Sequence, residues 1–598
     1  MKKRVADIVM DILVENGITD CFMVVGGGAM NLNNALALRD DIHKVFNHHE
    51  QACAMAAEAY TKACGKLALV CVTSGPGALN TLTGVEGAWV DNTPMLVISG
   101  QTRYATSVES TGLPLRYRGV QEHEITKTVQ TITKYAKKIY NPLEIKYELQ
   151  KAIHVALSGR KGPVWIDIPL DVQSSIVEEK ELDEYCAESE DALDLADGDI
   201  ELIRQCFSKA NRPCILTGSG LRSANAVEAF RLMVLKWKIP IVGGALQADI
   251  LPLNFPNYFG MSGSVGPRAG NYILQNADLI LVLGNSLSFK QTGFEQAQFA
   301  PNAQIIMVDV DKNEAKKPGL HVDISITADL YNFCNKMMDC HLKLDASKEW
   351  LSYCGKVYSR FPAIEFDEQY CSKEGVSQYE FWQEFYKQSG EDSAIALGNS
   401  NCVVGCLQKG IRYDEQRVIV NYNCGSMGDD LPEAIGVCIA LKKPVYCVTG
   451  DGSVMMNLQE LQTIVHNDFP IRIVIFSNDG YGAIRQTNKN FFNGLYLGCD
   501  KESGVSFPEM KKVAEAFGFL YNVCEKKEEL AESIKWLNGQ KKYAILEMKQ
   551  KITDPVLPKV MSKMLPDNSF YTPALHDMYP FMEKEVVDEY MLQGKKGR

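Results

Sequence analysis

Two oxygen-bearing side chains follow neighbouring apolar runs in the second half of the chain. Residues 444–449 and 471–477 are rich in β-branched residues and predict two buried strands, with apolar residues at helical spacing between them. Asp451 comes directly after the first run and Asn478 after the second. A strand–helix–strand unit of this kind makes parallel strands. We therefore expect Asp451 and Asn478 at one sheet edge, where open α/β sheets bind ligands.

The residues around Asp451 suit the binding of a metal and a diphosphate. A carboxylate, the Asn478 amide oxygen and the backbone carbonyl of Gly480 are the hard oxygen ligands that Mg²⁺ prefers. Gly450 and Gly452 would let the backbone approach phosphates, and Ser453 is expected to cap the following helix. The alternative is an ordinary turn in which Asp451 is only a helix cap, because short glycine motifs recur by chance.

A second candidate, Glu50, opens a helix near the other end of the chain. It follows Asn47-His48-His49, at the end of a short apolar run, and precedes the small residues 52–59. A carboxylate at such a buried boundary costs several kcal/mol unless it is paired or protonated. Taken alone, Glu50 is better explained as an acidic residue favoured by the helix dipole.

These residues need rigid elements to position them, and the chain supplies three α/β segments. Alternating strand and helix patterns predict an α/β protein with three doubly wound parallel-sheet domains, over residues 1–175, 195–340 and 378–555. An acidic stretch, 178–199, predicts a solvated linker, and a helical connection is expected over 341–377. The tail, 556–598, predicts a loop followed by a helix, which either folds over a site or packs on the surface.

Composition excludes several classes of function. The chain has 598 residues, 46% of them hydrophobic, and a net charge of −12, so no nucleic-acid partner is expected. The N-terminal segment is amphipathic and no apolar run is long enough to cross a bilayer. The 18 cysteines lack paired CxxC spacing and many lie in apolar runs. They are typical of buried core residues in a reduced cytoplasmic protein.

The motif Gly-Asp-Gly-Ser, followed by a helix, a strand and Asn478, resembles the cofactor motif of thiamine diphosphate (ThDP) enzymes. The segments HEQ, TSGPG and NTPMLVISGQ resemble the acetohydroxyacid (acetolactate) synthase group of that family. The resemblance covers nearly the whole chain. It implies pyrimidine-binding, central and diphosphate-binding domains, the cofactors ThDP and Mg²⁺, and a 2-oxo acid donor with a carbonyl acceptor. It also implies a homodimer or homotetramer, in which Glu50 and Asp451 of one site come from different chains.

The resemblance also assigns roles to individual residues. Glu50 would hydrogen-bond N1′ of the aminopyrimidine, which activates C2 of the thiazolium, and Gln121 would face the reacting carbon. Asp451, Asn478 and Gly480 would bind the metal. Met427 would support the bent cofactor, and the carbonyl of Gly425 would accept a hydrogen bond from its 4′-amino group. Other expected cofactor contacts are Gly27, Gly28, Gly398, Asn399, Ser400, Gly450, Gly452 and Ser453.

The chain departs from the acetohydroxyacid synthase pattern on the acceptor side and in the central domain. Ala483, Thr487 and Val120 stand where that group has Met, Trp and Phe. Exchanging bulky groups for small ones predicts a larger acceptor pocket, unless the tail refills it. The arginine-rich segment of the flavin-binding members is absent, with Lys290 near the place of an arginine that meets the acceptor. Gly218-Ser219-Gly220 is a weak signal by itself, so bound FAD stays open.

Three functions compete at this stage. The first is a ThDP- and Mg²⁺-dependent carboligase that decarboxylates pyruvate or a similar 2-oxo acid and transfers the two-carbon unit to an acceptor carbonyl. The acceptor is either a second oxo acid or a bulkier compound such as a keto-sugar nucleotide. The second is a simple decarboxylase that releases aldehyde. Its relatives carry a His-His pair where this chain has only His123. The third is a non-catalytic subunit, which the presence of Glu50, Asp451 and Asn478 disfavours.

Overall fold

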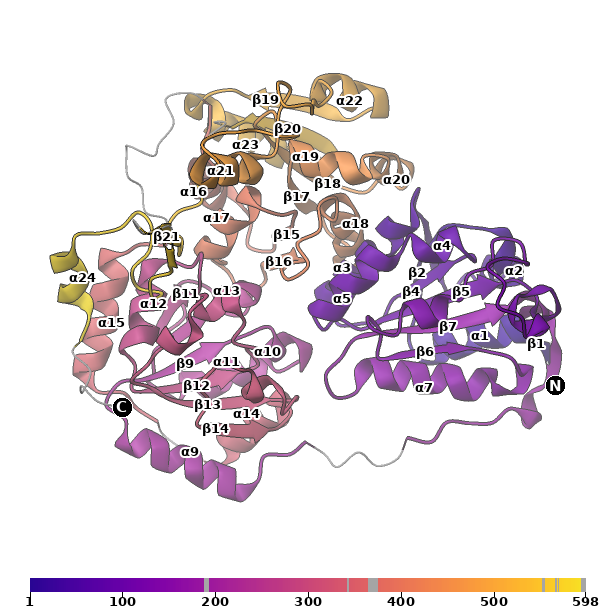
Figure 1. Cartoon of the computed structure of the whole chain (residues 1–598), viewed down its shortest axis with the longest axis horizontal. Coiled ribbons are helices and arrows are strands. Elements are labelled where there is room, and N and C mark those ends of the chain that lie inside the picture. Colours follow the sequence, from indigo (N-terminus) through magenta and orange to yellow (C-terminus); the bar gives the residue numbers. More distant parts are fainter. Residues whose placement is uncertain are drawn as a thin grey trace.

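Three α/β domains and a C-terminal tail make up the structure, which is a computed structural model (Figure 1). It describes residues 1–187, 193–340, 344–363, 375–550, 554–564, 567 and 569–592. Each domain is built on one six-stranded sheet, and all pairs of neighbouring strands in these sheets are parallel. The predicted fold class, three doubly wound parallel-sheet domains, is confirmed. Sheets of this kind bury both faces, which explains why most strands are continuous apolar runs.

The N-terminal domain has the strand order β3-β2-β4-β5-β7-β6. A short strand, β1 (Lys2–Arg4), pairs antiparallel with β8 (Ile176–Glu178) beside this sheet. The sheet strands are β2 (Asp20–Met23), β3 (His43–Phe46), β4 (Leu69–Val72), β5 (Met95–Gln101), β6 (Tyr135–Lys138) and β7 (Pro163–Pro169). The main helices are α1 (Val5–Glu15), α2 (Met30–Ala37), α3 (Glu50–Cys64), α5 (Leu82–Val90) and α7 (Ile145–Leu157).

The central domain has the strand order β11-β10-β9-β12-β13-β14. Its strands are β9 (Pro213–Thr217), β10 (Ile241–Gly243), β11 (Tyr258–Met261), β12 (Leu279–Leu283), β13 (Gln304–Asp309) and β14 (Ile324–Thr327). Its main helices are α9 (Asp197–Lys209), α11 (Val227–Leu235), α12 (Arg268–Asn276) and α14 (Leu330–Asp339). Helix α15 (Lys348–Arg360) follows in the predicted helical connection, of which residues 341–343 and 364–374 lie outside the described residues.

The C-terminal domain has the strand order β16-β15-β17-β18-β20-β19. Its strands are β15 (Ala394–Leu397), β16 (Arg417–Val420), β17 (Val445–Gly450), β18 (Ile471–Ser477), β19 (Leu520–Cys524) and β20 (Ala544–Lys549). Its helices include α16 (Gln378–Gln388), α17 (Asn401–Lys409), α18 (Asp430–Leu441), α19 (Asp451–Val454), α20 (Glu460–His466), α21 (Gly482–Phe491), α22 (Met510–Phe517) and α23 (Leu530–Asn538).

One local prediction in this domain is wrong. Ser453 does not cap a helix, because α19 already begins at Asp451 with Gly450 as its N-cap. The Ser453 hydroxyl instead donates to Asp430 and accepts a hydrogen bond from the Gly428 N–H, so tertiary contacts use both of its functions. The expected single helix is also interrupted by the 3₁₀ turn Met455–Asn457, which lies between α19 and α20.

The tail runs over the central domain, and its last described helix is α24 (Lys584–Tyr590). Buried polar side chains of α12 hold its backbone: Asn271 donates to the Leu575 carbonyl and Asn276 to the Tyr590 carbonyl. A small hairpin of β21 (Lys563–Met564) and β22 (Phe570–Tyr571) lies near α21 (Figure 1). In the described part of the chain, no helix combines the length and apolar character needed to cross a membrane.

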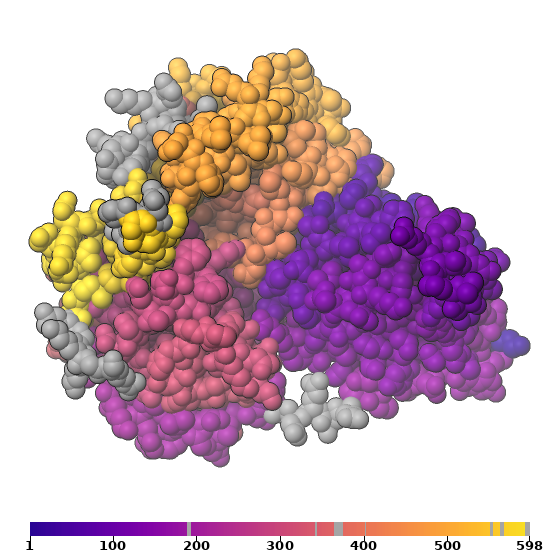
Figure 2. Space-filling view, viewed as in Figure 1, coloured from indigo at the N-terminus to yellow at the C-terminus, as the bar shows by residue number. Residues whose placement is uncertain are grey.

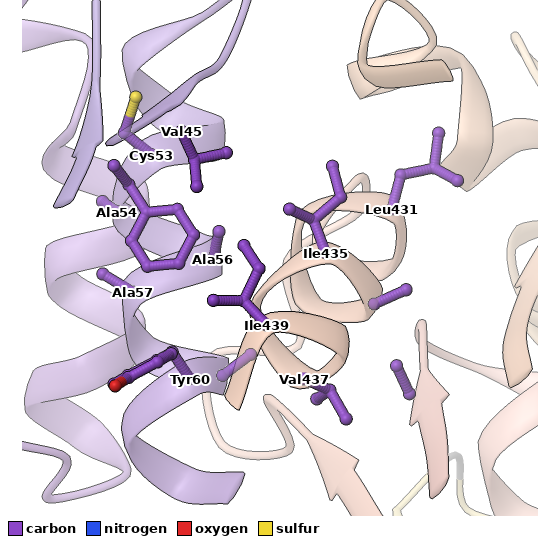
Figure 3. Close-up of a cluster of buried hydrophobic side chains, with 14 of the residues drawn as sticks. Val45, Cys53, Ala54, Ala56, Ala57, Tyr60, Leu431, Ile435, Val437 and Ile439 are labelled. Carbon is purple, nitrogen blue, oxygen red and sulfur yellow. The ribbon is translucent and has the colours of Figure 1, made fainter. Parts of the chain in front are cut away.

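The N- and C-terminal domains meet along a tightly packed helix pair. Helices α3 and α18 are in extensive contact, and residues of both belong to one buried hydrophobic cluster. Figure 3 shows Ile435 and Ile439 of α18 beside the small residues of α3, such as Ala56. The small side chains of α3 thus let the two helices approach closely, and this contact brings the start of α3 to the C-terminal domain.

Candidate functional site

The C-terminal half of the site lies where β17 and β18 end. The carboxylate of Asp451 is buried and accepts backbone N–H groups of Gly452 and Asn478, at 2.8 and 2.9 Å, and of Gly480 at 3.3 Å. Burial raises the pKa of Asp451 to about 6, although these N–H donors lower it. The prediction that Asp451 and Asn478 share one sheet edge is correct, because β17 and β18 are parallel neighbours.

An unpartnered oxygen beside this carboxylate matches the chemistry of a magnesium ligand. Within the described structure, the buried Oδ1 atom of Asn478 has no hydrogen-bond partner, while its Nδ2 donates to Gln550. Buried polar oxygens without a partner are rare and costly. No group of three His, Cys, Asp or Glu side chains is placed to hold a metal among the described residues. A metal here would use amide and carbonyl oxygens together with Asp451, a donor set that suits a hard cation.

The loops that would surround a diphosphate lie against the same edge. Gly425 and Ser400 adopt positive φ angles of 61° and 60°, which shape two tight turns. Asn399 donates to the Gly425 carbonyl at 3.2 Å, so the two loops are joined. Met427 follows Gly425 in its loop and is partly buried. A methyl group on Gly398 would lie 3.0 Å from Asp430 Oδ2, so this turn packs tightly against the Asp430 side chain.

Asp430 is a residue of this site that sequence reasoning missed. Its buried carboxylate accepts the hydroxyls of Thr449 and Ser453, at 2.7 and 2.5 Å, and so ties the end of β17 to the start of α18. Through Ser453 it also supports the Gly428 N–H. The sequence feature that could have indicated Asp430 is the acidic pair Asp429-Asp430 at the start of a mainly apolar helix.

The N-terminal half of the site contains Glu50 and Gln121 on either side of one turn. Glu50 is partly buried and accepts Asn80 Nδ2 at 2.9 Å. A methyl group on Gly77 would lie 3.3 Å from Glu50 Oε1, and one on Gly75 would lie 2.3 Å from the Gln121 carbonyl oxygen. The structure therefore brings the two predicted catalytic residues together, although they are 71 positions apart in the sequence.

Gly27 and Gly28 occupy the neighbouring turn, between β2 and α2. The Gly28 N–H donates to Thr73 Oγ1, and a methyl group on Gly28 would lie 2.6 Å from Ser74 Oγ. Gly27 has open space around it, since no described atom lies within 4 Å of a methyl group placed there. Gly28 is thus required by close packing, whereas Gly27 leaves an open surface beside the turn that contains Gly75.

Side chains next to Glu50 join the two halves of the site. Glu460 accepts both the Asn47 side-chain amide and the His48 N–H, at 2.9 and 3.0 Å. On the other side of Glu50, Asn457 donates to Gln51 Oε1 and to the Gly428 carbonyl. The start of α3 is therefore fastened to the C-terminal domain from both sides. Sequence patterns did not indicate Asn457 or Glu460, because their partners lie about 400 residues away.

Both halves meet within a single chain. The expected sharing of the site between two chains stays a prediction.

Buried acids line the helix seam behind the site. Lys62 pairs with Glu58 and Asp91, at 2.6 and 2.7 Å. Among the described residues, no donor reaches the carboxylate oxygens of Asp429 or Glu433. Burial, reinforced by the neighbouring negative charges, raises the pKa of both groups well above the ordinary range. One lysine cannot neutralise the whole cluster, so the surroundings favour the protonated form of both acids.

The acceptor side is open in this structure. Ala483 and Thr487 lie one helical turn apart on α21, and both side chains are exposed. In its described part the tail contacts this helix: Lys559 donates to Gln486 at 2.9 Å, and Phe570 contacts Phe491 with ring centroids 6.1 Å apart. The tail therefore borders α21 without burying the two small residues.

A cavity of about 680 Å³ lies where the three domains meet, at the carboxyl end of the central sheet (Figure 2). Gly218 and Gly284 line it, and a methyl group on Gly218 would lie 2.1 Å from the Gly284 carbonyl oxygen. The close packing of these two strand ends is enough to explain the glycine at position 218. The glycine turn is therefore no evidence for a bound nucleotide. Lys290 also lines the cavity, but its ammonium donates to the Tyr422 carbonyl and lies 4.2 Å from the Tyr422 ring centre.

Comparisons with known proteins agree with this arrangement. Three family descriptions match successive parts of the chain. They are "Thiamine pyrophosphate enzyme, N-terminal TPP binding domain" over residues 3–130, the central domain of the same enzymes over 200–337, and their C-terminal TPP binding domain over 403–548. Each match contains one of the three parallel sheets or most of it, so the fold and the site together define a three-domain ThDP-enzyme architecture.

Individual relatives lead to the same group. The chain is 28% identical over 541 residues to the acetolactate synthase large subunit of Buchnera aphidicola subsp. Schizaphis graminum, covering 88% of this chain and 91% of the relative. It is 28% identical to the acetolactate synthase isozyme 2 large subunit of Escherichia coli (86% and 89% covered) and to the large subunit of Lactococcus lactis (93% and 94%). The chain therefore belongs to the thiamine pyrophosphate enzyme family, and the relatives named here are acetolactate synthase large subunits.

Proposed function

We propose that this protein is a ThDP- and Mg²⁺-dependent carboligase that decarboxylates pyruvate or a similar 2-oxo acid and joins the two-carbon unit to an acceptor carbonyl. One observation supports the proposal: Glu460 and Asn457, which follow Asp451 in the chain, bind the residues on either side of Glu50, and the buried Asn478 Oδ1 at the neighbouring strand end has no partner in the described structure. ThDP, when bound, supplies a C2 carbanion and an electron sink for the decarboxylation.

Residues of the C-terminal domain would hold the metal and the diphosphate. The Asp451 carboxylate, Asn478 Oδ1 and the Gly480 carbonyl would bind Mg²⁺, and the turns containing Gly398, Asn399, Ser400, Gly450, Gly452 and Ser453 would border the diphosphate. The Asp451 carboxylate is already oriented by three backbone N–H groups, which leaves its remaining lone pairs for a cation.

Residues of both domains would act on the aminopyrimidine and the substrate. Glu50 would hold a proton at N1′, with Asn80 fixing the orientation of its carboxylate. The Gly425 carbonyl would accept from the 4′-amino group, Met427 would support the bend, and Gln121 would face the reacting carbon. Gly27 and Gly28 would form the turn beside the pyrimidine.

The first test is a product assay with ThDP, Mg²⁺ and pyruvate. Release of CO₂ together with acetolactate is the expected result, and the Glu50→Gln variant should lower both by about a hundredfold, the size of a lost proton-transfer group. Full activity of Glu50→Gln would contradict the assigned role. CO₂ with free acetaldehyde as the main product would favour the simple decarboxylase instead.

A bulkier acceptor is favoured by one further observation, the exposure of Ala483 and Thr487 on α21. The space that larger side chains would fill is open, so an acceptor of the size of a keto-sugar nucleotide has room to approach. Assays that supply such acceptors with pyruvate test this directly. Acetolactate formed at the same rate with and without them would refute it.

We also propose a homodimer or homotetramer located in the cytoplasm. Support for oligomers comes from exposed apolar residues on an N-terminal-domain loop, among them Leu113, Tyr117 and Val120, at 58, 64 and 75% exposure. Measuring activity after the variants Glu50→Gln and Asp451→Asn are mixed tests whether sites are shared between chains. Activity regained on mixing would show shared sites, and no gain would show sites within one chain.

All 17 described cysteines are free, as expected for a reduced compartment.

Bound FAD is a separate question, and the three-domain cavity is where a flavin would lie. Three of the lining cations already have partners: Arg222 and Arg417 pair with Asp249, and Lys290 donates to the Tyr422 carbonyl. A flavin absorption spectrum of the purified protein decides the matter.

A further inference from the structure

The loop that presents Gln121 is held in a strained conformation. Gln121 has a φ of 51°, in the left-handed region, where residues other than glycine are uncommon. Its carbonyl oxygen packs against Gly75, a position at which any side chain would collide with that oxygen. Strained residues of this kind persist only when their surroundings hold them firmly.

Glu122 supplies the first part of that support. Its Oε1 accepts the Val108 N–H at 2.7 Å, and its Oε2 accepts the Gly119 N–H at 2.9 Å. One carboxylate therefore bridges the two ends of the loop, immediately beside Gln121. Hydrogen bonds from backbone N–H groups to an ionised carboxylate are stronger than neutral ones.

A buried chain of hydrogen bonds holds His123, which lies two positions after Gln121 in the sequence. Gln101 Nε2 donates to the His123 carbonyl at 2.7 Å and to Asp167 Oδ2 at 3.1 Å. Asp167 also accepts the Ser99 hydroxyl at 2.6 Å. Gln101 and Asp167 are buried on the rigid strands β5 and β7, so this side of the loop is fixed to the sheet. Glu122 is the anchor on the exposed side.

We infer that Glu122 is a positioning residue for the carboligation, which acts by holding Gln121 in its left-handed conformation beside Glu50. This inference rests on the proposed role of Gln121. Glutamine at position 122 keeps one acceptor oxygen, but its amino group would face a backbone N–H, so one of the two loop bonds is lost. Gln121 then relaxes toward an ordinary conformation and moves from the reacting carbon.

The test is a double-mutant cycle with pyruvate, or with the 2-oxo acid that wild type turns over best in a donor panel. Glu122→Gln and Gln121→Ala are each expected to lower kcat for ligation by about a hundredfold, the cost of a displacement of about 1 Å at a reacting centre. In the Gln121→Ala background, Glu122→Gln should cause no further loss. Glu109→Gln is the matched control: it lies on the same loop and pairs with Lys138 and Tyr140, and it should leave kcat unchanged.

Two further readouts separate positioning from general damage. Hydrogen exchange of the Val108 and Gly119 amides should accelerate in Glu122→Gln, while ThDP affinity stays as in wild type. Equal kcat for Glu122→Gln and wild type, or losses that multiply in the double variant, would overturn the inference. Full activity of Gln121→Ala would overturn it too, and would remove the role of Gln121 while leaving the ThDP-dependent release of CO₂ intact.

Discussion

Helices α3 and α18 lie very close together at Gly436, and a single methyl group there tests their packing. A Cβ atom on Gly436 would lie 2.1 Å from the Ala56 carbonyl oxygen and 3.0 Å from the Tyr60 nitrogen. Both obstacles are backbone atoms of α3, so neither can rotate away. Because non-bonded heavy atoms need about 3.5 Å, Gly436→Ala forces α3 and α18 apart by about 1 Å.

Two opposing effects determine how much Gly436→Ala changes the free energy of unfolding. Overpacking of a close contact costs about 1–3 kcal/mol, and a rigid backbone obstacle puts this site at the upper end. Replacing glycine by alanine inside a helix returns about 1 kcal/mol. We expect a net loss of about 2 kcal/mol in the free energy of unfolding. For a domain of this size the melting temperature should fall by about 4–8 °C.

Gly355→Ala is the matched control, because it makes the same change in another helix with the opposite expected sign. Gly355 lies within α15 and nothing is within 4 Å of a methyl group placed there. Only the helix-propensity gain remains, so this variant should be more stable than wild type by about 0.5–1 kcal/mol. Differential scanning calorimetry of the three proteins in one buffer measures both shifts.

Activity provides the second readout for Gly436→Ala. Glu50 begins α3, so separation of the helices should also weaken the contacts of Asn457 and Glu460 with the start of α3 and lower turnover. A Gly436→Ala protein that melts at or above the temperature of Gly355→Ala, with wild-type turnover, would refute the close packing of α3 on α18 and with it the assembly of the site described above.

Three further predictions concern the metal, the pH dependence and the acceptor. Asp451→Asn should weaken Mg²⁺-dependent ThDP binding about 10- to 100-fold, measured by cofactor titration, and unchanged affinity would exclude Asp451 as a ligand. Burial raises the pKa of Asp167 to about 7, so the folded state binds this proton more tightly than the unfolded state. The free energy of unfolding should therefore fall as the pH rises from about 4 to about 7. Urea unfolding of Asp167→Asn over that range should lack this slope. Thr487→Trp combined with Ala483→Met should lower ligation to a bulky acceptor about tenfold or more while sparing ligation to pyruvate, and equal losses for both acceptors would argue against a size filter.

Much of the fold and half of the candidate site could be predicted from local patterns. The strand Ile471–Ser477 occurs at the predicted residues, because a β-branched apolar run between turns has few other stable conformations. Asp451 and Asn478 were predicted at one edge because a right-handed crossover leaves no other place for two successive parallel strand ends. These inferences need only short-range sequence and chain handedness.

Tertiary structure alone decided how the halves of the site are joined and supported. Ser453 was expected to cap a helix, but the buried carboxylate of Asp430 draws its hydroxyl away. Glu460 binds Asn47 and His48 across more than 400 residues, and such a pairing leaves no periodic trace in either segment. Sequence by itself therefore determined the elements and the chemistry of their ends. The packing of α3 on α18 determined which ends meet, because it depends on the close fit of helices that are far apart in the chain.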